Sequence, residues 1–163
     1  MTERRVFRSD TFVNRSFVAG IPFILMFGGL THFAFAWLGK TNWAAPFVPV
    51  NESVWEHLKM SYWTTFLWFF FIFLFFGKRY RLSSSRWLLA GIVSMLFCLL
   101  FIFGIISGQL LASRTYRYVE PHRIRIGMAV ALWLILALAF VLFSFQPPVL
   151  PLFLDTPTGS YGF

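Results

Sequence analysis

The chain reads SYWTTFLWFFFIFLFFG from Ser61 to Gly77, a run that is almost entirely aromatic or aliphatic. A helix needs about 20 apolar residues to cross the hydrocarbon core of a bilayer. Three further runs have this character, and they cover 16–38, 87–112 and 126–145. The sequence therefore predicts an all-α fold: a polytopic transmembrane helical bundle with four spans and a Pro/Gly-rich tail over 146–163.

The composition excludes most other classes of protein. Hydrophobic residues make up 58% of the 163 residues and charged residues only 12%, whereas a soluble domain carries about 25% charge. A soluble domain of this size cannot hide so much apolar surface from water. We therefore expect one membrane domain over 1–163, and neither a disordered chain nor a disulfide-stapled module.

The charge balance is strongly basic, with 14 Lys and Arg against six Asp and Glu, a formal net charge of +8. These charges flank the apolar runs, so they are explained better by the bilayer and its anionic lipid headgroups than by nucleic acid. We expect lipid partners and no nucleic acid. Basic residues crowd the N-terminus, 78–86 and 113–125, which places these segments in the cytoplasm and the protein in the cell membrane.

This charge pattern conflicts with four simple spans, because 87–112 would then enter and leave on one side. We favour a single, straight and somewhat overlong helix over 87–112, because broken backbone exposed to lipid is costly. The alternative is a re-entrant segment broken near Phe103–Gly104 and Ser107–Gly108. Four spans place the tail in the cytoplasm. An odd number of crossings would place the tail beside 51–59, where Asp155 could approach the polar residues there.

The stretch PVNESVWEHLK, from Pro49 to Lys59, predicts a helix that starts here and runs into the second span without a break. Asn51 can cap this helix, and Ser53 and Glu56 have the spacing of a capping box. The simplest interpretation is a capped helix start anchored by Trp55 at the membrane interface.

A second interpretation is a site, because His32 lies inside the first span, and an ionisable residue at membrane depth usually has a partner. The candidate cluster is His32, Glu52, Glu56 and His57. We expect one of Glu52 or Glu56 to be the partner of His32, and we favour Glu56, since it lies closer along the chain to the second span. Such a set suits a divalent metal ion, a proton relay or acid–base chemistry, although its spacing matches no zinc motif.

A small-residue pattern, Gly104-x-x-x-Gly108, allows the close approach of another helix and makes a homo-oligomer an expectation. The run Asn51-Glu52-Ser53-Val54-Trp55-Glu56-His57-Leu58-Lys59, His32-Phe33 and the tail from Pro147 to Gly162 resemble a family of small bacterial multipass membrane proteins of unknown function. The resemblance implies five spans, but this chain departs from the family between Trp87 and Ala112. There it lacks a polar turn and part of a neighbouring span.

Two functions follow from these residues. The first is a non-enzymatic membrane protein, an assembly or small-solute transport component, which is favoured because the chain is short and has no catalytic motif. The second is a membrane-embedded enzyme that acts on a lipid-like substrate, with the His/Glu cluster as its metal or acid–base site. The resemblance brings no established activity that decides between them.

Overall fold

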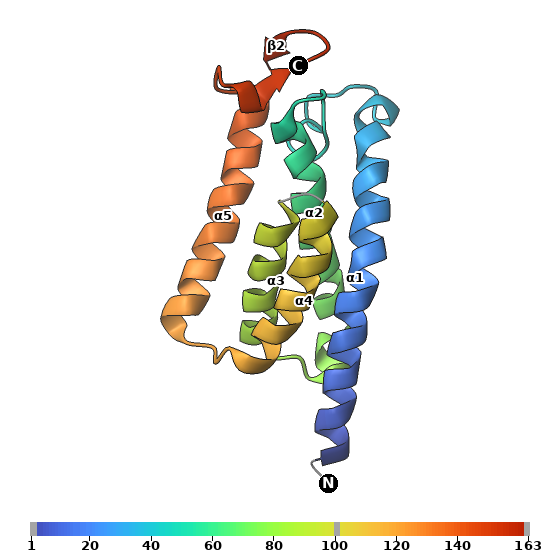
Figure 1. The fold of residues 1–163 in the computed structure, drawn as a ribbon, viewed down its shortest axis with the longest axis vertical. Helices are drawn as coiled ribbons and strands as arrows, with labels where there is room; N and C mark the ends of the chain where they lie inside the picture. The colour runs from blue at the N-terminus through green and yellow to red at the C-terminus, as the bar shows by residue number, and fades with distance from the viewer. Residues whose placement is uncertain (1–2, 100–101, 162–163) are drawn as a thin grey trace.

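The computed structural model describes residues 3–99 and 102–161, with side chains for 10–99 and 107–161. Within these residues the chain forms a bundle of five α-helices, which confirms the all-α expectation (Figure 1). The helices are α1 (Glu3–Trp37), α2 (Val54–Tyr80), α3 (Ser84–Cys98), α4 (Ile102–Tyr118) and α5 (Arg123–Phe145). A short 3₁₀ helix, η1 (Pro151–Phe153), precedes the antiparallel strands β1 (Leu154–Asp155) and β2 (Ser160–Tyr161).

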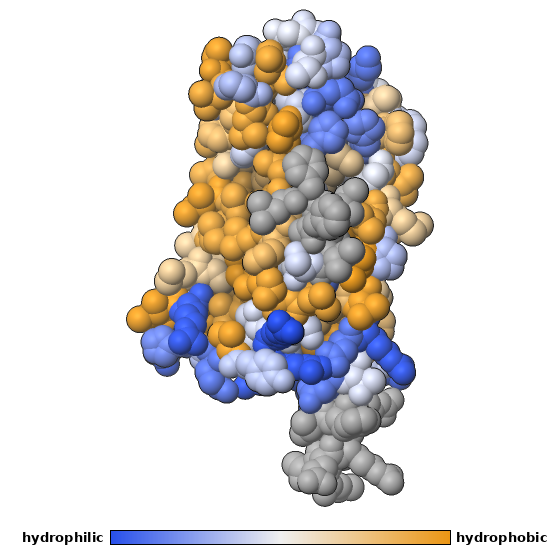
Figure 2. Space-filling view, viewed as in Figure 1, coloured by the Kyte–Doolittle hydropathy of each residue, from blue (hydrophilic) through white to orange (hydrophobic). Residues whose placement is uncertain are grey.

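In the part of the chain that the structure describes, three helices are long and apolar enough to cross a membrane: Asp10–Trp37 of α1, Val54–Tyr80 and Arg123–Phe145. The last of these has a mean hydropathy of 2.8 in its most apolar window, of which only 11% is buried in the bundle. A helix that is apolar all round and yet unburied needs an apolar solvent. Figure 2 agrees, with apolar residues over the middle of the visible face and hydrophilic residues at both ends.

The expectation of one continuous helix over 87–112 is wrong. α3 ends at Cys98, α4 begins at Ile102, and the two helices run side by side in opposite directions (Figure 1). The helices approach closely because Gly108 has no side chain: a Cβ there would lie 2.8 Å from the carbonyl oxygen of Ser94. Gln109, which is buried, donates a 2.6 Å hydrogen bond to the Ser94 hydroxyl. Gly108 thus serves a contact within the chain.

The hairpin of α3 and α4 is held against the long helices by aromatic packing. The Trp87 indole lies 5.0 Å from the Phe69 ring and 5.5 Å from the Phe17 ring, between centroids. Its Nε1–H donates a 2.9 Å hydrogen bond to the Phe69 carbonyl oxygen of α2. This packing lies at the open end of the hairpin, whereas beside the break the buried Cys98 packs with Ile24 of α1. Broken helical backbone is tolerated at membrane depth where protein packs against it.

The basic connections lie together at the end of the bundle where α1 begins (Figure 1). Arg86, at the start of α3, pairs with Glu120 after α4 at 3.2 Å. The tail lies at the opposite end, where Asp155 accepts a 2.9 Å hydrogen bond from the Glu52 backbone N–H. The preference for a tail on the basic side is therefore corrected: because α3 and α4 form a hairpin, the tail lies beside 51–59.

Gly108→Ala should lower the free energy of unfolding by about 1–3 kcal/mol, because its new methyl group collides with backbone of α3. Gly127→Ala is the matched control, since a Cβ there meets nothing within 4 Å. The control should be neutral or stabilising by up to about 1 kcal/mol. Unfolding of the purified full chain in detergent measures both variants. Equal stability of the two variants would show that α3 and α4 do not pack through Gly108.

Candidate metal centre

The connection between α1 and α2 is held in place by main-chain acceptors. Gly39, with φ of 70°, turns the chain after α1. The Pro46 carbonyl oxygen accepts a 2.9 Å hydrogen bond from Trp63 Nε1 of α2. The Ala45 carbonyl oxygen accepts hydrogen bonds from Lys59 Nζ at 2.8 Å and from the Ser144 hydroxyl of α5 at 3.2 Å. The connection is therefore fixed to two helices.

A buried ion pair lies directly under this connection. Lys59 Nζ lies 2.6 Å from Glu56 Oε2, and the exposed fractions of the two side chains are 0% and 4%. The same carboxylate oxygen accepts a 3.0 Å hydrogen bond from the Val50 backbone N–H. Charges removed from water are stable only when they are paired and hydrogen-bonded, and each partner here meets both conditions.

The turn into α2 uses side chains as acceptors for its free N–H groups. Asn51 Oδ1 accepts from the Ser53 N–H at 3.0 Å, and the Ser53 hydroxyl accepts from the Glu56 N–H at 3.3 Å. The predicted uninterrupted helix is confirmed, but its N-cap is Ser53 rather than Asn51. The Thr158 hydroxyl, aided by the Glu52 N–H, holds the pKa of Asp155 below its usual range, which keeps the tail carboxylate charged.

This turn brings Glu52 between two histidines. Glu52 Oε1 lies 3.4 Å from Nε2 of His32, near the end of α1, and Glu52 Oε2 lies 3.6 Å from Nε2 of His57, in the first turn of α2. One ligand atom from each residue lies within 4.8 Å of the other two. The side chains are 30%, 50% and 31% exposed for His32, Glu52 and His57, so the group opens to the surface.

These distances fit ligands of one metal ion better than hydrogen bonds. An N–H···O hydrogen bond spans about 2.7–3.2 Å, shorter than both observed distances. Two tetrahedral zinc ligands with bonds near 2.0–2.1 Å lie about 3.3 Å apart. Each histidine nitrogen therefore lies at nearly this spacing from one oxygen of Glu52, His32 from Oε1 and His57 from Oε2. One ligand atom from each residue, all within 4.8 Å of one another, would have to draw closer to bind a single zinc ion.

The second ring nitrogen of His57 supports the same interpretation. Nδ1 lies 2.9 Å from the Ser53 carbonyl oxygen, which can only accept, so Nδ1 carries the proton. In neutral His57 the lone pair is then on Nε2, which faces Glu52. Metal-binding histidines almost always donate their other ring N–H to an outer acceptor of this kind.

The structure thus brings together three of the four predicted residues: His32, Glu52 and His57. The expectation that Glu56 partners His32 is wrong, because Glu56 is paired with Lys59 and the partner of His32 is Glu52. Glu56 and His57 are adjacent in α2, so they project about 100° apart and meet different neighbours. Sequence reasoning missed the role of Lys59, although its spacing of three from Glu56 is the signal for such a pair.

The chemistry available at the cluster is metal binding with one position open. Three protein ligands leave the fourth tetrahedral position to water or a bound solute. Hydrolytic zinc sites also use a separate carboxylate as general base. Of the described carboxylates at this end of the bundle, Glu56 is held by Lys59, and Asp155 is held by Glu52 N–H and Thr158.

The fold and cluster define an all-α bundle with three helices of membrane-spanning length and a His₂Glu group at one end. The model of a protein family, the family of unknown function DUF6512, matches residues 6–105 and 97–163. The chain belongs to this family. The two matches overlap at 97–105, where α3 gives way to α4. No curated protein and no solved structure matches the chain.

Glu56→Gln should destabilise the protein by about 3–5 kcal/mol, because it leaves the Lys59 charge buried without a counter-charge. Glu120→Gln is the matched control, since its pair with Arg86 is solvent-exposed and contributes about 0–1 kcal/mol. Chemical unfolding of the purified chain measures both.

A second variant, Glu56→Gln with Lys59→Met, removes both charges and should recover most of the lost stability. If Glu56→Gln and Glu120→Gln cost the same, the Glu56–Lys59 pair does not hold the connection in place.

Proposed function

We propose that this chain is a multipass integral protein of a bacterial cell membrane with a cytoplasmic N-terminus. α1, α2 and α5 cross the bilayer, while α3 and α4 enter from the cytoplasmic side and return to it. α3 has 15 residues and α4 has 17, about 22 and 26 Å, which is less than the 30 Å hydrocarbon core. This arrangement keeps every basic connection in the cytoplasm, as the positive-inside rule requires.

Three crossings put the connection between α1 and α2, and the tail, on the outer side of the membrane. The His32, Glu52 and His57 cluster then lies at the outer mouth of the bundle, where it meets metal ions in solution. The buried Glu56–Lys59 pair and the Asp155 contact lie beside it and fix the position of Glu52. Glu52 therefore sits on a supported turn rather than on a free loop, between histidines that belong to two helices.

We propose that the protein is a non-enzymatic membrane component, in assembly or small-solute transport, that works with a divalent metal ion bound at this mouth. The observation that carries the proposal is the Glu52 carboxylate between two Nε2 atoms at 3.4 and 3.6 Å. A metal ion here joins the end of α1 to the start of α2. The engagement of Glu56 and Asp155 elsewhere favours this role over hydrolysis.

The second candidate function is a metal enzyme that acts on a lipid-like substrate. It is favoured by one observation: the three side chains are about one third to one half exposed, so a substrate could reach a metal ion held by them. In such an enzyme a metal-bound water would be the nucleophile, and Glu52 would have to leave the metal to act as base.

Titration of the purified full chain with Zn²⁺ tests the metal centre. The wild-type chain should bind one ion, and His57→Ala should weaken binding by more than the roughly 10–100-fold that loss of an outer partner costs. His122→Ala is the matched control, because this third histidine caps α5 at the opposite end and its Nδ1 accepts from the Ile124 N–H.

Equal loss in the His57 and His122 variants would contradict the proposal, as would a wild-type chain that binds no Zn²⁺. Glu52→Gln keeps the shape of the side chain and should weaken binding like His57→Ala, whereas Glu56→Gln should leave bound-ion stoichiometry unchanged in the folded fraction. Retained Zn²⁺ in Glu52→Gln would remove Glu52 from the ligand set.

A further inference from the structure

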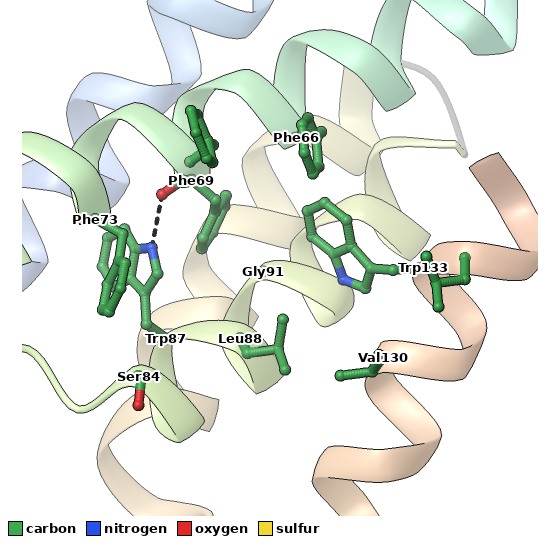
Figure 3. A pocket seen from close by; sticks show the side chains of 11 residues that line it. Phe66, Phe69, Phe73, Ser84, Trp87, Leu88, Gly91, Val130 and Trp133 are labelled. Carbon is green, nitrogen blue, oxygen red and sulfur yellow. Dashed lines mark hydrogen bonds between the residues drawn. The ribbon is translucent and has the colours of Figure 1, made fainter.

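An apolar groove of about 390 Å³ lies between α2, α3 and α5 on the basic half of the bundle (Figure 3). Its walls include Phe66 and Phe73 of α2, Leu88 of α3, and Val130 and Trp133 of α5. Gly91 forms part of its floor, because a Cβ there would lie only 3.2 Å from the Trp133 ring. The missing side chain lets the indole lie directly against α3.

The groove is short enough to lie within one membrane leaflet. Its lining runs from Phe66 to Phe73 on α2 and from Ser84 to Gly91 on α3, a rise of about 10 Å on each helix. Half of a 30 Å hydrocarbon core is about 15 Å. On α3 the groove begins at Ser84, the first residue of that helix, so this wall starts at the basic end of the bundle.

The mouth of the groove is basic. Arg123 lies seven and eleven residues before Val130 and Leu134, which places it on the same face of α5. Arg123 is exposed and has no ion pair among the described residues. The helix ends and connections nearby add Lys78, Arg79, Arg81, Arg86 and Arg125, and the described carboxylates at this end of the bundle are those of Glu120 and Asp10. This balance complements an anionic headgroup, and the walls behind it are apolar.

We propose that the groove holds one acyl chain of an anionic phospholipid from the cytoplasmic leaflet, with the lipid phosphate at Arg123 and Ser84. The apolar walls accept the chain, and the basic mouth selects the charge of the headgroup. This inference rests on the membrane placement proposed above and is independent of the metal centre. The bound lipid would pack against α3 of the hairpin and fill the space between α2 and α5.

Quenching of tryptophan fluorescence by brominated lipids tests the inference on the full chain in vesicles. One sample consists of unlabelled phosphatidylcholine with a small fraction of phosphatidylglycerol whose acyl chains are brominated. In the other sample the same mole fraction of phosphatidylcholine is brominated. The difference in fluorescence between the wild-type chain and Trp133→Phe is the signal of Trp133, which lines the groove. Brominated phosphatidylglycerol should quench this signal more strongly than brominated phosphatidylcholine does.

Arg123→Gln should reduce the preference for phosphatidylglycerol about fivefold, the contribution of one basic residue at an anionic surface. Arg114→Gln is the matched control, an exposed arginine of α4 that does not flank the groove. Val130→Phe fills the groove and should also abolish the excess quenching. Leu138→Phe, farther along the exposed face of α5, should not.

Equal quenching of the Trp133 signal by the two lipids would overturn the inference, as would equal effects of Arg123→Gln and Arg114→Gln. Failure of the membrane placement has a different signature, because neither brominated lipid would then quench any tryptophan of the chain. General quenching without a phosphatidylglycerol preference would keep the placement and reject the lipid site.

Discussion

The constraint on which the structure depends is that its basic connections all lie at one end of the bundle. Basic residues lie at the start of α3 and at the end of α4. If both of these ends are to stay on the same side of the membrane, the two helices cannot join into one long span. The chain meets this constraint by folding 84–118 into the hairpin of α3 and α4, closed by Gly108 against Ser94. The Arg86–Glu120 pair joins the two ends of that hairpin at 3.2 Å.

The position of the candidate site follows from the same constraint. An odd number of long helices after the N-terminus brings the tail to the end opposite the basic connections. There Asp155 accepts from the Glu52 N–H, while the buried Glu56–Lys59 pair holds the connection before it. Glu52 is thereby held from two directions, and its carboxylate lies between His32 and His57. The polar cluster is a product of the fold and not of a local motif.

Much of this fold was predictable from composition and local pattern. Apolar length identified the long helices, and the Ser53 and Glu56 spacing predicted the start of α2. The charge pattern also indicated a segment that returns to its own side, but the cost of broken backbone in lipid favoured the straight helix. That cost falls once protein packs beside the break, as Ile24 of α1 does against the buried Cys98, a contact between residues 74 apart that local sequence does not reveal.

The sequence predicted which residues lie near the site, but not which of them contact one another. His32 at membrane depth required a partner, and the carboxylates of PVNESVWEHLK were the nearest along the chain. Depth along the chain favoured Glu56, but the direction of each side chain decided the outcome. Glu56 lies on the inward face of α2, where it is buried together with Lys59. Glu52 precedes the helix, and its side chain points toward His32. Sequence order carries no information about that direction.

The side of the membrane on which the tail lies tests the account most directly. Single cysteines would replace the exposed residues Tyr118, beside the α4–α5 connection, and Thr156, in the tail, in a Cys98→Ser background. The account predicts that an impermeant thiol reagent labels the Thr156→Cys chain on intact cells and the Tyr118→Cys chain only after permeabilisation. The reverse pattern would contradict it, because four simple spans put the α4–α5 connection outside and the tail in the cytoplasm.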